Sequence, residues 1–127
     1  MNNSVNSDKN ITIQDLKDIA KKFRDDRDWA QFHTPKELAI DMSIEAGELL
    51  ELFLWKSKEE IAEKLNSDKN FKENVSDELA DVVHACLAFA NSAGIDLASA
   101  VIAKIEKTAQ KYPIEKAKGQ TKKYTEL

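Results

Sequence analysis

Two pairs of acidic residues occur at helical spacing within otherwise apolar stretches of this sequence. Glu45 and Glu48 form the first pair, and Glu78 and Asp81 form the second. Residues three apart share one face of an α-helix, so each pair presents two carboxylates together. Neither pair has a Lys or Arg three or four residues away, and unpaired carboxylates are costly among apolar neighbours. A hard divalent cation such as Mg²⁺, which prefers oxygen ligands, removes that cost.

Glu51 extends the first acidic row by one more turn of helix. It is a candidate outer ligand, or a base for a bound water. A single acidic pair on a helix usually means a solvated face. Two pairs on neighbouring antiparallel helices are harder to obtain by chance, so the four carboxylates are interpreted as metal ligands.

His84 lies three residues after Asp81, a carboxylate–histidine spacing that also occurs in di-iron helical bundles. Such sites need the Glu-x-x-His pattern twice. This sequence has two histidines, and the residue three before His33 is Ala30 rather than Glu. A di-iron site is therefore not expected, and His84 is interpreted as a helix residue near the site.

Aromatic side chains stand just before and just after the segment that carries the first acidic pair. Flat rings stack on nucleobases with a gain of ~1–3 kcal/mol each, but aromatic residues equally serve to pack cores and interfaces. From the residues alone, both interpretations stay open. The set consists of Trp29, Phe32, His33 and Trp55.

Basic residues recur near the end of the chain, where Lys104, Lys107 and Lys111 fall on or near one helix face and Tyr112 follows. A solvated charge stripe explains most such patterns. The functional alternative is that one or two of these lysines contact phosphate oxygens.

Capping signals and apolar periodicity divide the chain into helices that must position these groups. Thr12, Thr34, Ser57 and Asp96 are the expected N-caps, and Gly94 is the expected C-terminal stop. Residues 1–10 are predicted to be disordered and residues 114–127 to form an extended tail. The predicted helices cover residues 13–28, 35–55, 58–65, 71–92 and 97–111.

Composition supports an all-α, four-helix-bundle-like fold of one domain. The 127 residues include 3 Gly and 2 Pro, which favours helix over irregular structure. A net charge of −4 argues against a nucleic acid polymer as partner. The single Cys86 cannot form an internal disulfide, no signal peptide is expected, and no apolar run reaches the ~18 residues of a membrane span. A cytoplasmic protein without membrane contact is expected.

Four segments, in order and at matching spacing, resemble the MazG-like all-α nucleoside triphosphate pyrophosphohydrolases, and among them the dCTP pyrophosphatase branch. The resemblance extends over residues 12–127 and implies a helical domain at residues 11–113. The segments are RDWAQFH at 27–33, EAGELLELFLW at 45–55, ELAD at 78–81, and KYP at 111–113 with KYTEL at 123–127.

This resemblance implies roles for individual residues. Mg²⁺ would be held by Glu45, Glu48, Glu78 and Asp81. The predicted catalytic residues are Glu48, Glu51 and Lys104. The residues predicted to bind substrate are Trp29, Gln31, Phe32, His33, Trp55, Lys107, Thr108, Lys111 and Tyr112.

The resemblance also implies the reaction, which is Mg²⁺-dependent hydrolysis of a nucleoside triphosphate between the α and β phosphates. The products are the monophosphate and pyrophosphate, and dCTP or a modified dCTP is the expected substrate, as in the clearance of unwanted nucleotides. Homodimers or dimers of dimers (homotetramers) are expected, with sites at subunit contacts. The alternatives are a broad-specificity pyrophosphohydrolase and a helical binding module without activity.

Four positions depart from the pattern of these families. The wider family often has an extra Glu where this chain has Ile44. The dCTP-type enzymes have His, Tyr and Asn where this chain has Ala20, Ala85 and Thr108. Because hydrogen bonds to a buried base edge provide strong discrimination, these differences bear on the choice of base.

Overall fold

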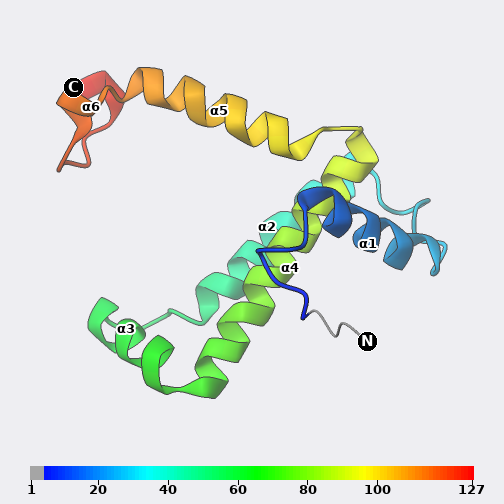
Figure 1. The fold of residues 1–127 in the computed structure, drawn as a ribbon. Helices are drawn as coiled ribbons and strands as arrows, with labels where there is room; N and C mark the ends of the chain where they lie inside the picture. The colour runs from blue at the N-terminus through cyan, green and yellow to red at the C-terminus, as the bar shows by residue number, and fades with distance from the viewer. Residues whose placement is uncertain (1–4) are drawn as a thin grey trace. The chain divides into compact units, whose positions relative to one another are not determined.

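The structure is a computed structural model, and it describes residues 5–127. Within this range the chain consists of helices and turns, without β-strand, which confirms the all-α prediction. It divides into two compact units, Met1–Gly94 and Ile95–Leu127. Figure 1 labels the helices of both units, and each unit is described by itself.

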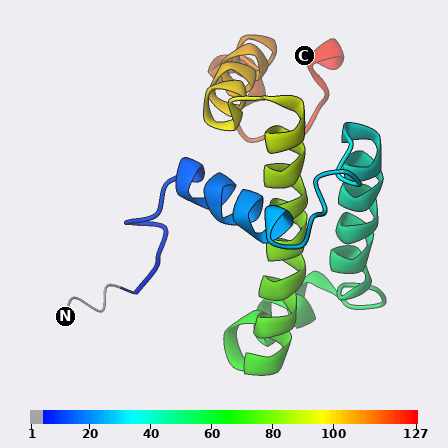
Figure 2. The ribbon, with the colours of Figure 1, turned by 90° about the vertical axis from the view of Figure 1, so that its right-hand side faces the viewer.

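The first unit is built on two neighbouring helices, α2 (Pro35–Glu51) and α4 (Lys69–Ala93). They pack along each other, and α1 (Ile13–Asp25) crosses α4 (Figure 2). The short α3 (Lys58–Ser67) connects α2 to α4 and also packs against α4. The central helix α4 therefore contacts every other helix of this unit.

The helix starts follow local hydrogen bonds that the sequence predicts. The side chains of Thr12, Thr34 and Ser57 each accept a hydrogen bond from the backbone N–H three residues later. Asp15 completes a capping box by accepting from the N–H of Thr12 at 2.9 Å. Gly94 ends α4 with a left-handed φ of 66°, as expected for a glycine at this position.

Several predicted helix ends are wrong by a few residues. Helix α1 stops at Asp25 instead of residue 28, because Asp28 takes a left-handed φ of 53° and the N–H of Trp29 returns to the carbonyl of Arg24. Helix α2 stops at Glu51 instead of Trp55, where the chain turns with a φ of 62° at Trp55. Helix α4 begins two residues early, because Asp68 caps it through the N–H of Phe71.

The core of the first unit is small and lies where α4 meets its neighbours. The rings of Phe53 and Phe71 meet edge to face, 6.2 Å apart, and hold the turn that follows α2 against the start of α4. The part of the chain that the structure describes has no buried polar or charged residue. Its buried apolar residues are Ala20, Leu38, Phe71, Ala85, Leu87 and Ala90.

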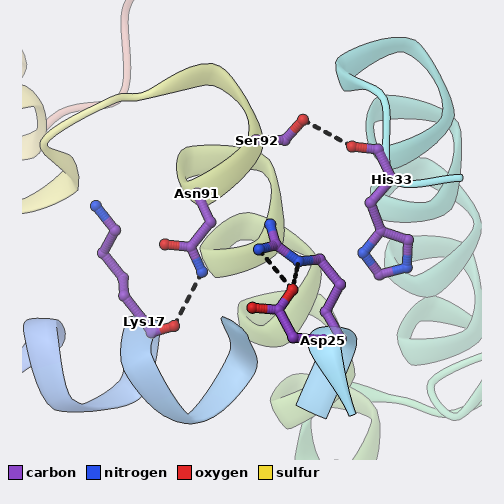
Figure 3. A network of polar contacts seen from close by, with 6 residues as sticks. Lys17, Asp25, His33, Asn91 and Ser92 are labelled. Atoms are coloured by element: carbon purple, nitrogen blue, oxygen red, sulfur yellow. Dashed lines mark hydrogen bonds and ion pairs between the residues drawn. The ribbon is translucent and has the colours of Figure 1, made fainter. Parts of the chain in front are cut away.

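Two long-range hydrogen bonds attach α1 and the aromatic connector to the end of α4 (Figure 3). The side-chain amide of Asn91 donates to the carbonyl of Lys17 at 2.9 Å, and the hydroxyl of Ser92 donates to the carbonyl of His33 at 2.7 Å. Both bonds are partly buried. They fix the direction in which residues 29–33 leave the helical body.

The second unit contains α5 (Leu97–Lys111), one helical turn α6 (Ile114–Ala117) and the 3₁₀ turn η1 (Tyr124–Glu126). Within it, the ring of Tyr112 meets that of Tyr124 at 5.9 Å. The tail was predicted to be extended, and it is instead partly helical because Pro113 starts a new turn after ending α5.

The predicted disorder of residues 1–10 falls partly on residues 1–4, which lie outside the described residues. Residues 7–10 form a turn in which the side chain of Asn10 accepts a hydrogen bond from the N–H of Ser7 at 2.9 Å. Among the described residues, no single helix has the length and apolar composition needed to cross a membrane.

Candidate metal centre

Three of the four predicted metal ligands converge where α2 faces α4. Glu45 comes from α2, and Glu78 and Asp81 come from α4, and each offers an oxygen within 4.8 Å of the other two. Two oxygens bound to one Mg²⁺ lie at most about 4.2 Å apart, since each metal–oxygen distance is about 2.1 Å. Small side-chain rotations therefore bring these oxygens around a single cation.

Glu48, the fourth predicted ligand, lies one turn along α2 from Glu45. It is outside the tight group, and its side chain is more exposed than that of Glu45. Its charge nevertheless acts on both Glu45 and Glu78, so it borders the same site. Its role as a direct ligand stays a prediction.

The carboxylates of this cluster are destabilised in their charged form. Oxygen Oε2 of Glu45 and Oε2 of Glu78 are buried and lack a hydrogen-bond partner. Burial, then the neighbouring Glu48, Asp81 and Asp41, raise the pKa of Glu45 to about 7. Burial and the same kind of acidic neighbours also raise the pKa of Glu78.

These observations test whether the residues fit a divalent cation. Buried oxygens without donors, from acids with raised pKa values, cost free energy unless a positive charge compensates them. All the groups that meet here are oxygen donors, the set that Mg²⁺ and Ca²⁺ prefer over softer metals. The site therefore fits a hard divalent cation.

A cavity of about 330 Å³ opens beside the cluster in the first unit. Glu45 and Asp81 line it, and so do Trp29, Phe32 and His33 of the aromatic connector. The structure thus brings three predicted substrate-binding aromatics and two predicted metal ligands to one cavity. Its size and mixed lining are typical of a small-molecule site.

The aromatic side of the cavity is held by ring contacts. Phe23 meets Trp29 edge to face at 5.7 Å and His84 at 5.4 Å. The backbone of His33 is fixed by Ser92, as Figure 3 shows, while its side-chain Nδ1 is buried without a partner. A buried ring nitrogen without a partner is available to a bound molecule.

Three predicted site residues of the first unit lie elsewhere. Trp55 is 94% exposed and does not line the cavity. The amide of Gln31 donates to the carbonyl and the carboxylate of Asp28, both at 3.1 Å. Glu51 is exposed at the last position of α2. Their predicted roles in catalysis or substrate binding stay predictions.

The remaining predicted site residues belong to the second unit. There the hydroxyl of Thr108 donates to the carbonyl of Lys104 at 2.9 Å. The ammonium of Lys111 lies 4.8 Å from the ring centre of Tyr124. Roles in phosphate or substrate binding stay predictions for Lys104, Lys107, Thr108, Lys111 and Tyr112.

Sequence reasoning missed several residues that line the cavity. Glu37 and Asp41 stand one above the other on α2, at four-residue intervals before Glu45. That spacing is itself a sequence signal, because such residues share a helix face. His84, interpreted as lying near the site, also lines the cavity, as does Ala85. Ala20, the position where the dCTP-type enzymes have His, does not line this cavity. It lines an apolar groove between α1 and α4.

The fold and this cavity define an all-α protein with a carboxylate site for a hard cation beside an aromatic pocket. Residues 40–127 match the MazG-like family, and the chain belongs to that family.

The chain is similar to curated proteins named dCTP pyrophosphatase 1. It is 37% identical to the Rattus norvegicus protein over 116 residues, covering 91% of this chain and 68% of that one. It is 35% identical to the Homo sapiens protein with the same coverage. A solved structure of a pyrophosphatase from Archaeoglobus fulgidus matches with a TM-score of 0.72 and 43% identity, covering 80% of this chain and 92% of that chain.

Proposed function

We propose that this protein is a nucleoside triphosphate pyrophosphohydrolase that hydrolyses dCTP, or a modified dCTP, to the monophosphate and pyrophosphate with the help of Mg²⁺. The family membership and the relatives named dCTP pyrophosphatase support the reaction class. The observation that carries the proposal in the structure is the convergence of Glu45, Glu78 and Asp81, because two of these carboxylates, Glu45 and Asp81, also line the aromatic cavity.

The acidic end of the cavity suits the phosphates only when a cation is present. A triphosphate brings several negative charges to a place that already holds Glu45, Glu78 and Asp81. Glu45, Glu78 and Asp81 would hold a Mg²⁺, which would neutralise phosphate charge and make the phosphorus more electrophilic. Without it, repulsion opposes binding.

The carboxylates also have a part in positioning and deprotonating water. Glu48 borders both Glu45 and Glu78, and Glu51 follows it by one turn of α2. We propose that Glu48 or Glu51 accepts the proton of the water that attacks the α phosphorus. Lys104, with Lys107 and Lys111, would offset charge on the leaving pyrophosphate.

The aromatic end suits the base. Trp29, Phe32 and His33 line the cavity, and stacking of a base on an aromatic ring is worth ~1–3 kcal/mol. Stacking alone discriminates little between bases. The preference for cytosine is therefore proposed from the relatives, and a broad-specificity pyrophosphohydrolase is the second candidate, favoured by the small Ala85 in the cavity wall.

Pyrophosphate release, measured over the eight common NTPs and dNTPs with and without Mg²⁺, tests this function. We expect Mg²⁺-dependent turnover with dCTP as the preferred substrate. Equal turnover of all eight would leave the reaction class and reject the cytosine preference. Turnover of none, in protein shown to be folded, would reject the enzyme assignment and leave a helical binding module.

A homodimer or dimer of dimers, acting in the cytoplasm, completes the proposal. The oligomer is supported by α5, which has no buried residue and carries the exposed apolar side chains of Val101, Ile102 and Ile105. Such a face on a helix is typical of a surface that another helix covers.

A further inference from the structure

The lining of the cavity changes in a regular order along α2. Glu45 lies at the end with Asp81, and Glu37 lies on the same helix face two turns away, near the aromatic connector. Asp41 stands between them, four residues from each. At a rise of about 1.5 Å per residue, it is about 6 Å along the helix axis from Glu45 and from Glu37.

This order matches the order of parts in a nucleotide. The carboxylate end suits metal and phosphates, and the aromatic end with Trp29 and Phe32 suits the base. The sugar joins the phosphates to the base, so a nucleotide that satisfies both ends lies with its sugar in the middle. The side chain that stands there on α2 is Asp41.

Asp41 is also available for a ligand. Its carboxylate lines the cavity and makes no hydrogen bond or ion pair with the described residues. Its charge adds to the cost of ionising Glu45 one turn away. Asp41 is exposed, so water solvates its carboxylate in the free protein, and a bound hydroxyl group can take the place of that water as a hydrogen-bond donor.

We propose that Asp41 is a specificity-determining residue that accepts a hydrogen bond from the 3′-hydroxyl of the bound nucleotide. An ionised carboxylate only accepts hydrogen bonds, and the 3′-hydroxyl is the only donor on a deoxyribose. The inference rests on the proposed hydrolysis of a deoxynucleoside triphosphate. It adds a residue that reads the sugar, in a cavity where the aromatic rings contact the base.

His33 gives this placement a second support at the base end. Its buried Nδ1 lacks a partner, and its backbone is anchored to Ser92 (Figure 3). A base whose edge reaches that nitrogen stacks near Trp29, which limits where the sugar can lie. Both features belong to the same cavity of the first unit.

Two substrates that differ in one hydroxyl test the proposal, namely dCTP and 2′,3′-dideoxycytidine triphosphate. The wild-type protein should show kcat/KM roughly tenfold higher for dCTP, the usual effect of one hydrogen bond to a charged group. In Asp41→Ala this ratio should fall close to one, mainly through loss of dCTP turnover. Asp41→Asn keeps a neutral acceptor and should give an intermediate ratio.

Asp18→Ala is the matched control, because it removes an exposed carboxylate of α1 that does not line the cavity. Its substrate ratio should equal that of the wild type. An unchanged ratio in Asp41→Ala would overturn the proposal, because Asp41 would then make no contact with the 3′-hydroxyl. An equal loss of turnover for both substrates would also overturn it, because Asp41 would then act at the metal end of the cavity. A change confined to the ratio of CTP to dCTP would also overturn it, because the 2′-hydroxyl would be the group read.

The same comparison by binding separates this inference from the proposed function. Dissociation constants for the two triphosphates, measured with Ca²⁺ from the change in tryptophan fluorescence, should show the same tenfold ratio and the same loss in Asp41→Ala. If the ratio appears in binding while no triphosphate is hydrolysed, the hydrolase assignment fails and the sugar contact stands. If hydrolysis occurs and neither measurement shows the ratio, the sugar contact fails alone.

Discussion

The carboxyl of Glu45 links the stability of the metal-free protein to pH. Burial and acidic neighbours raise its pKa from 4.5 to about 7. Between these two values the folded protein holds a proton that the unfolded chain releases, so stability is lost as the pH rises through this window. Glu78 shifts in the same direction and adds to the effect.

We expect the thermal midpoint of the metal-free protein, measured in a chelator, to fall as the pH rises from about 5 to about 7.5. Glu45→Gln should flatten this slope, because it removes the titrating group. Mg²⁺ should raise the midpoint more at the higher pH, where it does not compete with a proton. A midpoint that rises over this range without metal would contradict the assignment of a strained carboxyl cluster.

A substitution at Glu48 distinguishes an effect on catalysis from an effect on the stability of the fold. Its charge raises the pKa of both Glu45 and Glu78, so removing it relieves repulsion in the free protein. We expect Glu48→Gln to lower pyrophosphate release by roughly a hundredfold or more, while the metal-free protein unfolds at the same or a higher temperature. Glu59→Gln, on α3, should change neither quantity. Near-normal rates in Glu48→Gln would show that the metal assignment is wrong.

At the scale of the helices, caps and stops are decided by neighbours in sequence. Thr12, Thr34 and Ser57 start their helices by hydrogen bonds to a residue three positions on, and these starts were predicted. The ends of α1 and α2 were predicted too far along, because helical periodicity continues past Asp25 and Glu51. Apolar spacing does not reveal a left-handed residue such as Asp28 or Trp55.

Gly94 and Gly47 provide a matched test of one such stop. A Cβ built at either glycine meets nothing within 4 Å, so only backbone conformation distinguishes them. Gly94 has a φ of +66°, and we expect Gly94→Ala to cost about 1–2 kcal/mol of unfolding free energy. Gly47 lies inside α2, and Gly47→Ala should stabilise by about 0.5–1 kcal/mol.

Urea denaturation of both variants measures these changes. The critical result is that the two changes in unfolding free energy have opposite signs, because steric crowding by the added methyl group would destabilise both variants. If Gly94→Ala were neutral, the left-handed conformation at the end of α4 would not be required.

At the scale of the whole molecule, the second unit leaves an apolar surface on α5. Val101, Ile102 and Ile105 are 48%, 61% and 63% exposed. Large apolar side chains clustered on one helix are typical of an interface rather than of a solvated face. The MazG-like resemblance implies a second copy as the partner.

We therefore expect light scattering to give a mass of two or four times 14.3 kDa, the mass of one chain. Ile105→Lys should shift the protein towards smaller species, because it places a charge in an apolar contact. Gln110→Lys, on the same helix, is the control and should leave the mass unchanged. A wild-type protein of 14.3 kDa at micromolar concentration would contradict the predicted oligomer.

The sequence by itself determined the helices and the chemical type of the site. Cap residues and acidic pairs act over three or four positions, so Thr12, Gly94 and the pair Glu78–Asp81 can be read without a fold. The family resemblance added the reaction class, which the MazG-like match supports.

Only the tertiary structure decided which groups share one cavity. It placed Glu45 of α2 against Glu78 and Asp81 of α4, buried two of their oxygens, and left Trp55 exposed. It also placed Asp41 in the cavity wall, between the acidic and the aromatic ends. The physical reason is that burial and charge coupling depend on distances between helices, and those distances are set by packing between residues far apart in sequence.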